Sequence, residues 1–277
     1  MASLQVYTVP VAPGVTLECA ESGLPTGEPV LLLHGNGPNW RQFEPQLAAL
    51  ADRWRVLAPS LRGHGASTVP AEPSPADFSL ERLAADVAAL LDHLGVERAH
   101  VIGNSVGGLI GCELLRTRAG RVASLVTFGT TAELTSRRGT VAALGLATRL
   151  LGAGGMARIA GRTVADRTVG RRIAELIRTA DVRALRLVSR GVATYDYTLV
   201  LRASTVPWLL LRGEGDRSIN QHLASTLRVA EARDDAWVED LADAGHFANL
   251  ERPEAFDAAV RRFLLAHPLE AAPGGAG

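Results

Sequence analysis

The sequence predicts an α/β fold, with a mostly parallel sheet of eight strands and helices on both of its faces. Short apolar runs of strand length alternate with longer amphipathic segments of helix length along most of the chain. This alternation favours parallel pairing, because each helical crossover brings the chain back to the end of the sheet where the previous strand began. The chain has 277 residues, of which 47% are hydrophobic, and this is enough for one large domain with a buried core.

The predicted strands are expected to differ in burial. Residues 4–9 and 15–21 form a starting hairpin around Pro13 and Gly14, residue types that are common in turns. Pro29–His34 is a continuous apolar run, which is typical of a strand buried on both faces. The further predicted strands are 55–58, 99–104, 122–128, 206–212 and 237–241.

Helices are predicted between these strands where the apolar residues recur with a helical period. The clearest is 80–94, because Ser79 precedes it as an N-cap, Gly95 ends it, and its apolar residues share one face. Pro253 marks the first turn of a closing helix at 252–267. The other predicted helices are 39–51, 106–117 and 220–231, and the Gly-, Pro- and Ser-rich residues 61–75 are predicted as a loop.

Between residues 131 and 205 the strand signals disappear. We predict several helices here, with breaks at Gly152–Gly155, Gly161, Gly170 and Asp181. Thirteen arginines lie in this stretch; most are expected on a solvated surface, and one or two could face an acidic group of a substrate. The predicted organisation is a core of residues 1–130 and 206–270, a helical cap at 131–205 and a flexible tail at 271–277.

The composition argues against several classes of protein. Basic and acidic side chains balance at 29 each, which gives no reason to expect nucleic acid or a charged membrane surface as a partner. Cys19 and Cys112 are too few for a disulfide framework and are expected to be buried thiols. Neither a signal-peptide pattern nor an apolar run of membrane-spanning length is found. We therefore expect a cytoplasmic protein, monomeric or homodimeric, whose partner is a small molecule.

One stretch carries a recognisable chemistry. Residues 99–104 are predicted as a strand and 106–117 as a helix, and Gly103, Ser105 and Gly107 form the pattern G-x-S-x-G between them. A serine that projects from such a tight turn has a strained backbone, and its neighbours two positions away must be small. The N-terminus of the following helix would stabilise negative charge near the serine oxygen. The pattern in this context predicts a nucleophilic serine.

Five motifs in order resemble those of the α/β-hydrolase family, and together they span nearly the whole chain. They are His34–Gly37 after an early strand, Leu61–Ser67, Gly103–Gly108, Gly213–Asp216 and Gly245–His246. The order serine, aspartate, histidine along the chain is also the family's order. The resemblance implies the α/β-hydrolase fold with a helical cap, and it implies a hydrolase that acts on a small-molecule substrate.

The resemblance also implies a catalytic triad of Ser105, Asp216 and His246. His246 would take the proton of Ser105 and pass it to the leaving group. Asp216 would orient the imidazole and stabilise its charged form. The backbone N–H groups of Asn36 and Val106 would bind the oxyanion of the substrate, so turn geometry is expected to matter there more than the side chains.

Other residues compete for these roles. Glu214 is an alternative acid, but the family's pattern places the acid at Asp216. By resemblance, His34 and His64 stabilise turns near the site, while His100 lies in the strand before the serine. The remaining histidines are expected at the surface, and they are His93, His222 and His267. No side chains have metal-ligand spacing and no G-x-G-x-x-G follows a strand, so neither a metal nor a dinucleotide cofactor is predicted.

Local motifs narrow the expected reaction. A serine rather than an aspartate nucleophile argues against the haloalkane dehalogenase and epoxide hydrolase branches of the family. The loop 62–67, the Gly154–Met156 segment and the Tyr195–Asp196 pair resemble 3-oxoadipate enol-lactonases and related esterases. The expected reaction is hydrolysis of a small to medium carboxylic ester or lactone.

Alternatives remain open. His34–Pro38 together with Gly103–Ser105 is similar to hydrolases that cleave carbon–carbon bonds in ring-fission products, but those enzymes usually carry Trp where this chain has Phe247. Another alternative is a cofactor-free perhydrolase, cyclase or lyase of secondary metabolism on the same fold. A binding protein that keeps the triad is disfavoured, because all three residues are present.

Overall fold

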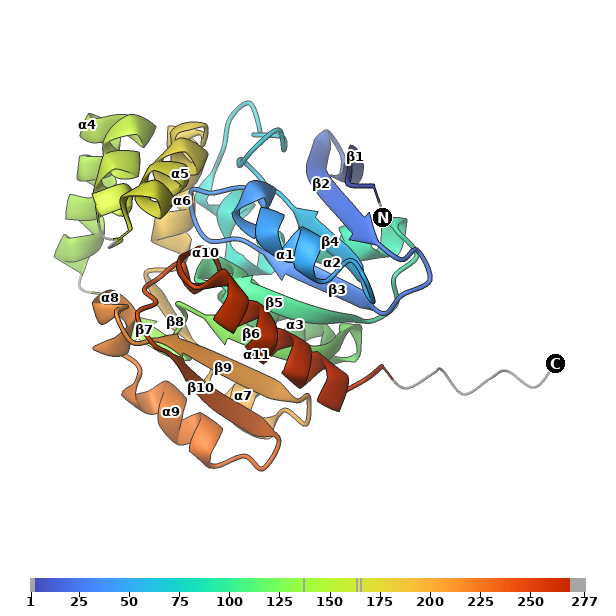
Figure 1. Ribbon diagram of the computed structural model, residues 1–277. Coiled ribbons are helices and arrows are strands. Elements are labelled where there is room, and N and C mark those ends of the chain that lie inside the picture. The colour runs from blue at the N-terminus through green and yellow to red at the C-terminus, as the bar shows by residue number, and fades with distance from the viewer. Residues whose placement is uncertain (1–2, 137, 163, 165, 270–277) are drawn as a thin grey trace.

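The computed structural model describes residues 3–136, 138–162, 164 and 166–269, so the predicted tail at 271–277 lies outside the described residues. Its centre is a sheet of β1 (Gln5–Ala12), β2 (Val15–Gly23), β3 (Pro29–Leu33), β4 (Arg55–Pro59), β5 (Ala99–Asn104), β6 (Val122–Phe128), β9 (Trp208–Gly213) and β10 (Ala236–Leu241). The eight strands lie in the order β1-β2-β4-β3-β5-β6-β9-β10 (Figure 1). β2 pairs antiparallel with β1 and β4, and every other pairing is parallel. The predicted fold class is confirmed.

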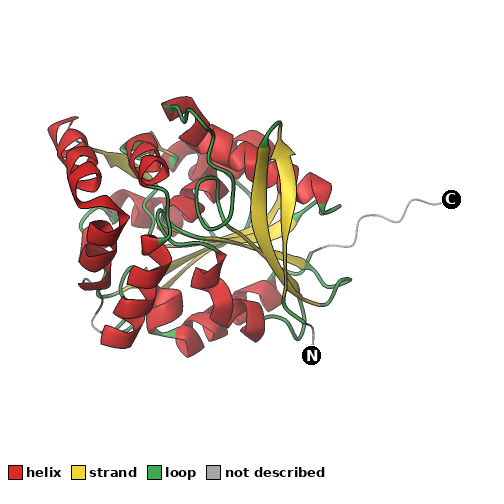
Figure 2. Cartoon of the chain, turned by 90° about the horizontal axis from the view of Figure 1, so that it is seen from above, coloured by secondary structure: helices red, strands yellow, loops and turns green. Residues whose placement is uncertain are grey.

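Helices cover both faces of the sheet, and Figure 2 shows the two layers from above. One layer contains α2 (Leu80–His93), α3 (Val106–Arg118), α7 (Thr198–Ala203) and α9 (Ala224–Glu231). The other layer contains α1 (Glu44–Ala49) and α11 (Pro253–Ala266). Every residue of β5 and β6 is buried, because both faces of these central strands pack against helices.

Two predicted helices are divided in the structure. The segment 39–51 forms a 3-10 turn, η1 (Trp40–Phe43), followed by α1. The segment 220–231 keeps only α9, and it is preceded by the short helix α8 (Arg217–Asn220). Asn39 and Asp216 start the first turns early, because their side chains accept hydrogen bonds from backbone N–H groups of η1 and α8. Three short elements are not predicted from the sequence, and they are η2 (Pro75–Phe78), η3 (Ala119–Arg121) and α10 (Ala248–Glu251).

Three helices between β6 and β9 pack together beyond the carboxyl ends of the central strands (Figure 1). They are α4 (Arg138–Arg162), α5 (Arg167–Arg178) and α6 (Val182–Gly191). Two three-residue strands, β7 (Glu133–Thr135) and β8 (Thr194–Asp196), pair antiparallel at the ends of this segment. The expectation of no strands here is wrong at these two places, because such short strands show no period in the sequence.

The predicted helix breaks are right at two positions and wrong at two others. Gly152 kinks α4 with a φ of 62°, and Asp181 caps the N-terminus of α6. Gly161 and Gly170, however, lie inside α4 and α5. A Cβ on Gly161 would lie 2.6 Å from the Gly170 carbonyl oxygen, and a Cβ on Gly170 would lie 2.3 Å from that of Gly161. These two glycines allow a close approach of two helices, rather than ending them.

α4 has 25 residues, a length that would reach across a lipid bilayer. It begins and ends with arginine, however, and Arg149 and Arg158 interrupt its apolar sequence. Among the helices that the structure describes, none is both long and apolar enough to cross a membrane.

Candidate active site

Ser105 lies on a sharp turn between β5 and α3, as the G-x-S-x-G pattern predicts. Its φ is 52° and its ψ is −115°, a combination that non-glycine residues rarely adopt. A Cβ on Gly103 would lie 2.4 Å from backbone atoms of Gly107, and a Cβ on Gly107 would lie 2.0 Å from the carbonyl oxygen of Leu33. Glycine is therefore required at both positions, because any side chain would collide with backbone.

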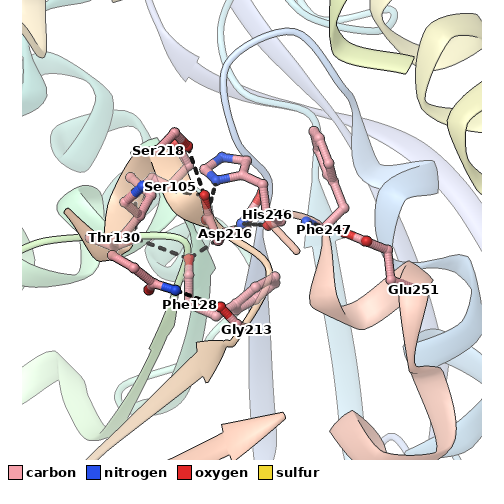
Figure 3. A network of polar contacts seen from close by, with 12 residues as sticks. Ser105, Phe128, Thr130, Gly213, Asp216, Ser218, His246, Phe247 and Glu251 are labelled. Carbon is pink, nitrogen blue, oxygen red and sulfur yellow. Dashed lines mark hydrogen bonds and ion pairs between the residues drawn. The ribbon is translucent and has the colours of Figure 1, made fainter. Parts of the chain in front are cut away.

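Hydrogen bonds from the end of β6 hold this turn in place. The backbone N–H of Ser105 donates to the carbonyl oxygen of Phe128 at 2.9 Å. The Thr130 hydroxyl donates to the carbonyl oxygen of Ser105 at 3.0 Å, and Figure 3 shows Thr130 beside the serine turn. Sequence reasoning missed Thr130, because it lies outside every recognised motif and only the sheet order brings it next to Ser105.

Asp216 and His246 are joined by a hydrogen bond of 2.7 Å between the carboxylate and the imidazole Nδ1 (Figure 3). Asp216 is 5% exposed and follows β9, whereas His246 lies in the loop after β10. Burial alone would raise the pKa of Asp216. Hydrogen bonds from His246, the Ser218 hydroxyl and the backbone N–H of Ile219 nevertheless keep this pKa below its usual value. Asp216 is therefore an ionised carboxylate at neutral pH.

Asn104 connects the serine turn to the loop that carries His246. Its Nδ2 donates to the carbonyl oxygen of His246 at 3.0 Å, and its Oδ1 accepts a hydrogen bond of 3.0 Å from Gln42. A Cβ on Gly129 would lie 3.0 Å from the imidazole ring, so this glycine leaves space for His246. Figure 3 draws Ser105, Asp216 and His246 as one group at the carboxyl ends of β5, β9 and β10. Their catalytic roles stay a prediction.

The loop after β3 lies against the serine turn from the other side. A Cβ on Gly35 would lie 3.4 Å from the Cβ of Ser105, which places the backbone of neighbouring Asn36 close to the serine. Val106 is the first residue of α3, where a backbone N–H has no acceptor within its own helix. The loop of Asn36 and the first residue of α3 therefore both lie next to Ser105, and the binding of an oxyanion by their backbone N–H groups stays a prediction.

The side chain of Asn36 makes hydrogen bonds of its own, although only the backbone geometry was expected to matter at this position. Its Nδ2 donates to the carbonyl oxygen of Leu185 at 3.0 Å and to the hydroxyl of Ser189 at 2.9 Å, and both of these residues belong to α6. Its Oδ1 lies 3.3 Å from Nε2 of His64. The amide thus ties the predicted oxyanion loop to α6 and lies next to the loop after β4.

His34 and His64 are buried, and both hold loops by hydrogen bonds to the backbone. Nε2 of His34 accepts a hydrogen bond from the N–H of Leu61 at 2.8 Å, which leaves Nδ1 to donate to the carbonyl oxygen of Gly35 at 2.7 Å. Nδ1 of His64 lies 3.0 Å from the carbonyl oxygen of Arg62. Burial lowers the pKa of His34 well below its usual value and that of His64 to about 4. Both are neutral supports of the loops at neutral pH.

The other residues that compete for the catalytic roles have different contacts. Nδ1 of His100 lies 2.8 Å from the Ser124 hydroxyl inside the sheet, and that of His267 lies 2.9 Å from the Phe263 carbonyl oxygen. Glu214 lies in the same turn as Asp216, but the imidazole of His246 contacts the carboxylate of Asp216. Cys19 and Cys112 are buried free thiols, as expected, and burial raises the pKa of each to about 12.

Apolar side chains from α4, α5 and α6 cover the loops of the site. Phe247, which follows His246, packs with Ala157 of α4 and Ile177 of α5 in one buried cluster. A Cβ on Gly37 would lie 3.1 Å from Ile177 and 3.5 Å from Leu185 of α6. The three helices therefore surround the site with apolar surface. Among the described residues, no group of three or more His, Cys, Asp or Glu side chains is arranged to hold a metal ion.

Comparison with known proteins agrees with this fold. A family model described as alpha/beta hydrolase fold matches residues 28–148. The chain is 26% identical over 273 residues to 3-oxoadipate enol-lactonase 2 of Acinetobacter baylyi, covering 91% of this chain and 94% of that protein. It is 34% identical over 125 residues to 2-hydroxymuconate semialdehyde hydrolase of a Pseudomonas species, covering 43% and 41% of the two chains. The crystal structure of the enol-lactonase from Burkholderia xenovorans superposes with a TM-score of 0.84 at 26% identity, covering 94% of this chain and all of that one.

Proposed function

Because this chain has the α/β-hydrolase fold and resembles enol-lactonases over most of its length, we propose that it is a serine hydrolase that cleaves a small to medium carboxylic ester or lactone. The observation that carries the proposal is the 2.7 Å hydrogen bond between His246 and buried Asp216, beside a serine on a strained turn. A serine hydroxyl is a weak nucleophile and needs a base whose own orientation is fixed. The hydrogen bond to Asp216 supports His246 as that base.

The proposed reaction has two half-reactions. With Nδ1 of His246 donating to Asp216, Nε2 is free to take the proton of Ser105 as its oxygen attacks the substrate carbonyl. The backbone N–H groups of Asn36 and Val106 stabilise the oxyanion of the tetrahedral intermediate. The protonated imidazole then gives its proton to the leaving alkoxide. Water, activated by the same imidazole, hydrolyses the acyl-enzyme and regenerates Ser105.

The surroundings of the site support an acyl pocket with apolar walls. Phe247, Ile177 and Leu185 are buried around the loops that carry His246 and Asn36. We propose that residues 131–205 act as the cap that excludes water from this pocket and selects the substrate. The enol-lactonase relative aligns over 91% of this chain, which favours the ester or lactone reaction.

Hydrolysis of a carbon–carbon bond is the second candidate. It is favoured by the 34% identity to 2-hydroxymuconate semialdehyde hydrolase, although that match covers 43% of this chain. A ring-fission diketone offered alongside the esters separates the two, because the C–C enzyme would consume the diketone much faster.

The proposal is tested by the turnover of p-nitrophenyl acetate and butyrate and by labelling with a fluorophosphonate. The wild type should hydrolyse the esters and be labelled at Ser105. Ser105→Ala should lose labelling and lower kcat/KM by about 10³-fold or more, because the other groups leave some catalysis in its absence. Ser225→Ala, on α9, is the matched control and should behave as the wild type. An unlabelled wild type, or equal labelling of Ser105→Ala, would contradict the assignment, and labelling without turnover would favour a non-hydrolytic enzyme.

A further inference from the structure

A large cavity lies between α4 and α6, apart from the residues assigned to the hydrolytic site. Its volume is about 850 Å³, within the range of small-molecule binding sites. α4 and α6 supply most of its walls, and residues at β7 and β8 together with Pro73 of the loop after β4 complete them. α4 and α6 contact each other, and Figure 1 shows them together with α5 on the side of the molecule beyond the sheet. Ser105, Asp216 and His246 do not line this cavity.

Four arginines line the cavity and give it a strong positive charge. Arg183, Arg186 and Arg190 lie three and four positions apart, so they project from one face of α6. Arg149 of α4 is the fourth. None of the residues that line the cavity is acidic, and only Arg183 has an ionic partner, Asp181, among the described residues. Guanidinium groups that share a concave surface repel one another, and a bound anion would remove that repulsion.

The remaining walls add apolar and hydroxyl groups. Leu146 of α4 and Leu187 of α6 present aliphatic surface, and Ser136 and Thr194 present hydroxyls near β7 and β8. Inorganic anions are strongly hydrated and gain nothing from aliphatic walls, whereas an anion with a hydrocarbon body would bury that body against them. Arginine forms paired hydrogen bonds with both carboxylate and phosphate groups.

We propose that this cavity is a binding site for a small organic anion, a carboxylate or a phosphate ester with an apolar body. α6 separates it from the hydrolytic site, because Leu185 on the opposite face of the helix packs toward Gly37. Ser189 is the link between the two, since it lines the cavity and also binds Asn36 of the loop near Ser105. The site is thus distinct from the acyl pocket and next to it.

The test is isothermal titration calorimetry of the full-length protein at low ionic strength. Phthalate and phenyl phosphate serve as the organic probes, and acetate and inorganic phosphate as probes without an aromatic body. The organic probes should bind more tightly than the others, and their binding should weaken as salt rises. Phthalate and phenyl phosphate also distinguish a carboxylate ligand from a phosphate ligand.

Arg186→Gln/Arg190→Gln should weaken binding of the preferred probe by about tenfold or more, because two charge-assisted contacts are removed. Arg171→Gln/Arg178→Gln is the matched control, since it removes the same net charge from exposed positions of α5 outside the cavity. It should bind as the wild type does. The proposal is wrong if neither organic probe binds the wild type, or if both double variants lose affinity equally. Thermal unfolding of each variant shows whether it is folded.

Discussion

Ser105 occupies a backbone conformation that costs on the order of 1–3 kcal/mol for a residue with a side chain. The surrounding contacts make that conformation possible. Gly103 and Gly107 remove every atom that would collide with the turn, while Thr130 and Phe128 bind its backbone. The turn exposes the serine at the N-terminus of α3, and this position gives the strain a functional explanation.

Asp216 provides the first prediction, because its lowered pKa keeps it charged toward His246. Asp216→Asn should lower kcat by about 10³- to 10⁴-fold with little change in KM, since the amide would favour the wrong imidazole tautomer. Steady-state kinetics with p-nitrophenyl butyrate measures this. Asp240→Asn, an exposed carboxylate on β10 paired with Arg212, is the control and should keep wild-type kcat. A kcat for Asp216→Asn within about threefold of the wild-type value would show that Asp216 does not orient the imidazole of His246 for catalysis.

At the scale of the elements, the chain uses glycine in two opposite ways in the helices beyond the sheet. Gly152 has a positive φ and bends α4. Gly161 and Gly170 have no such bend, and each instead meets the backbone of the other across the contact between α4 and α5. Residue type alone does not separate these two uses, because the close approach depends on which helices pack together.

The contact between α4 and α5 gives the second prediction. Gly170→Ala should lower the free energy of unfolding by about 1–3 kcal/mol, because its Cβ would lie 2.3 Å from a backbone oxygen that cannot move alone. Gly154→Ala, also in a helix, meets nothing within 4 Å and should be neutral or stabilising by up to about 1 kcal/mol. Urea unfolding measures both. Equal stability of the two variants would show that the helices do not approach as described.

The hydrogen bonds of Asn36 join the loop after β3 to α6, and they carry the third prediction. Ser189→Ala removes one of the contacts of the amide but leaves the one to Leu185. If the loop of Asn36 binds the oxyanion, this variant should lower kcat by about 3- to 10-fold, because a net hydrogen bond contributes about 0.5–1.5 kcal/mol. Ser204→Ala, after α7, is the control. An unchanged kcat for Ser189→Ala would show that the contact between α6 and the loop of Asn36 does not affect catalysis.

At the scale of the whole molecule, three buried histidines make stability depend on pH. Burial lowers the pKa of His64 and of His100 to about 4, and it lowers that of His34 well below its usual value. The unfolded chain therefore binds protons at these positions between pH 6.5 and about 4, while the folded chain does not. Their contribution to stability is complete above pH 6.5 and falls as the pH is lowered through this window.

The fourth prediction isolates one of these groups. Within this pH window, the free energy of unfolding should fall by about 1.4 kcal/mol per pH unit for each histidine as the pH decreases. His64→Gln should therefore make the slope smaller by the contribution of one histidine, about 1.4 kcal/mol per pH unit. Burial raises the pKa of Glu251 and Asp257, which opposes the slope, so the difference between variant and wild type is the quantity to compare. Exposed His93→Gln is the control and should leave the slope unchanged. A slope for His64→Gln equal to that of the wild type would contradict the prediction.

The sequence by itself determined which strands and helices follow one another along the chain, and it determined the turn that presents Ser105. These are local properties: a buried strand must be apolar, a helix in contact with it must be amphipathic, and a tight turn must have glycine. It also pointed to Asp216 and His246, because their short motifs follow strands in a recognisable order. The hydrogen bond between those two residues, 30 positions apart, is visible only in the folded chain.

The tertiary structure decided which residues support the site and what surrounds it. Asn104, Thr130 and Ser189 take part through contacts between segments that lie far apart in the sequence, and no local pattern reports such contacts. The same holds for the short strands β7 and β8, for the paired glycines of α4 and α5, and for the arginine-lined cavity. All of these features depend on how the helices pack beyond the carboxyl ends of the strands. That packing is set by the whole chain rather than by any one segment of it.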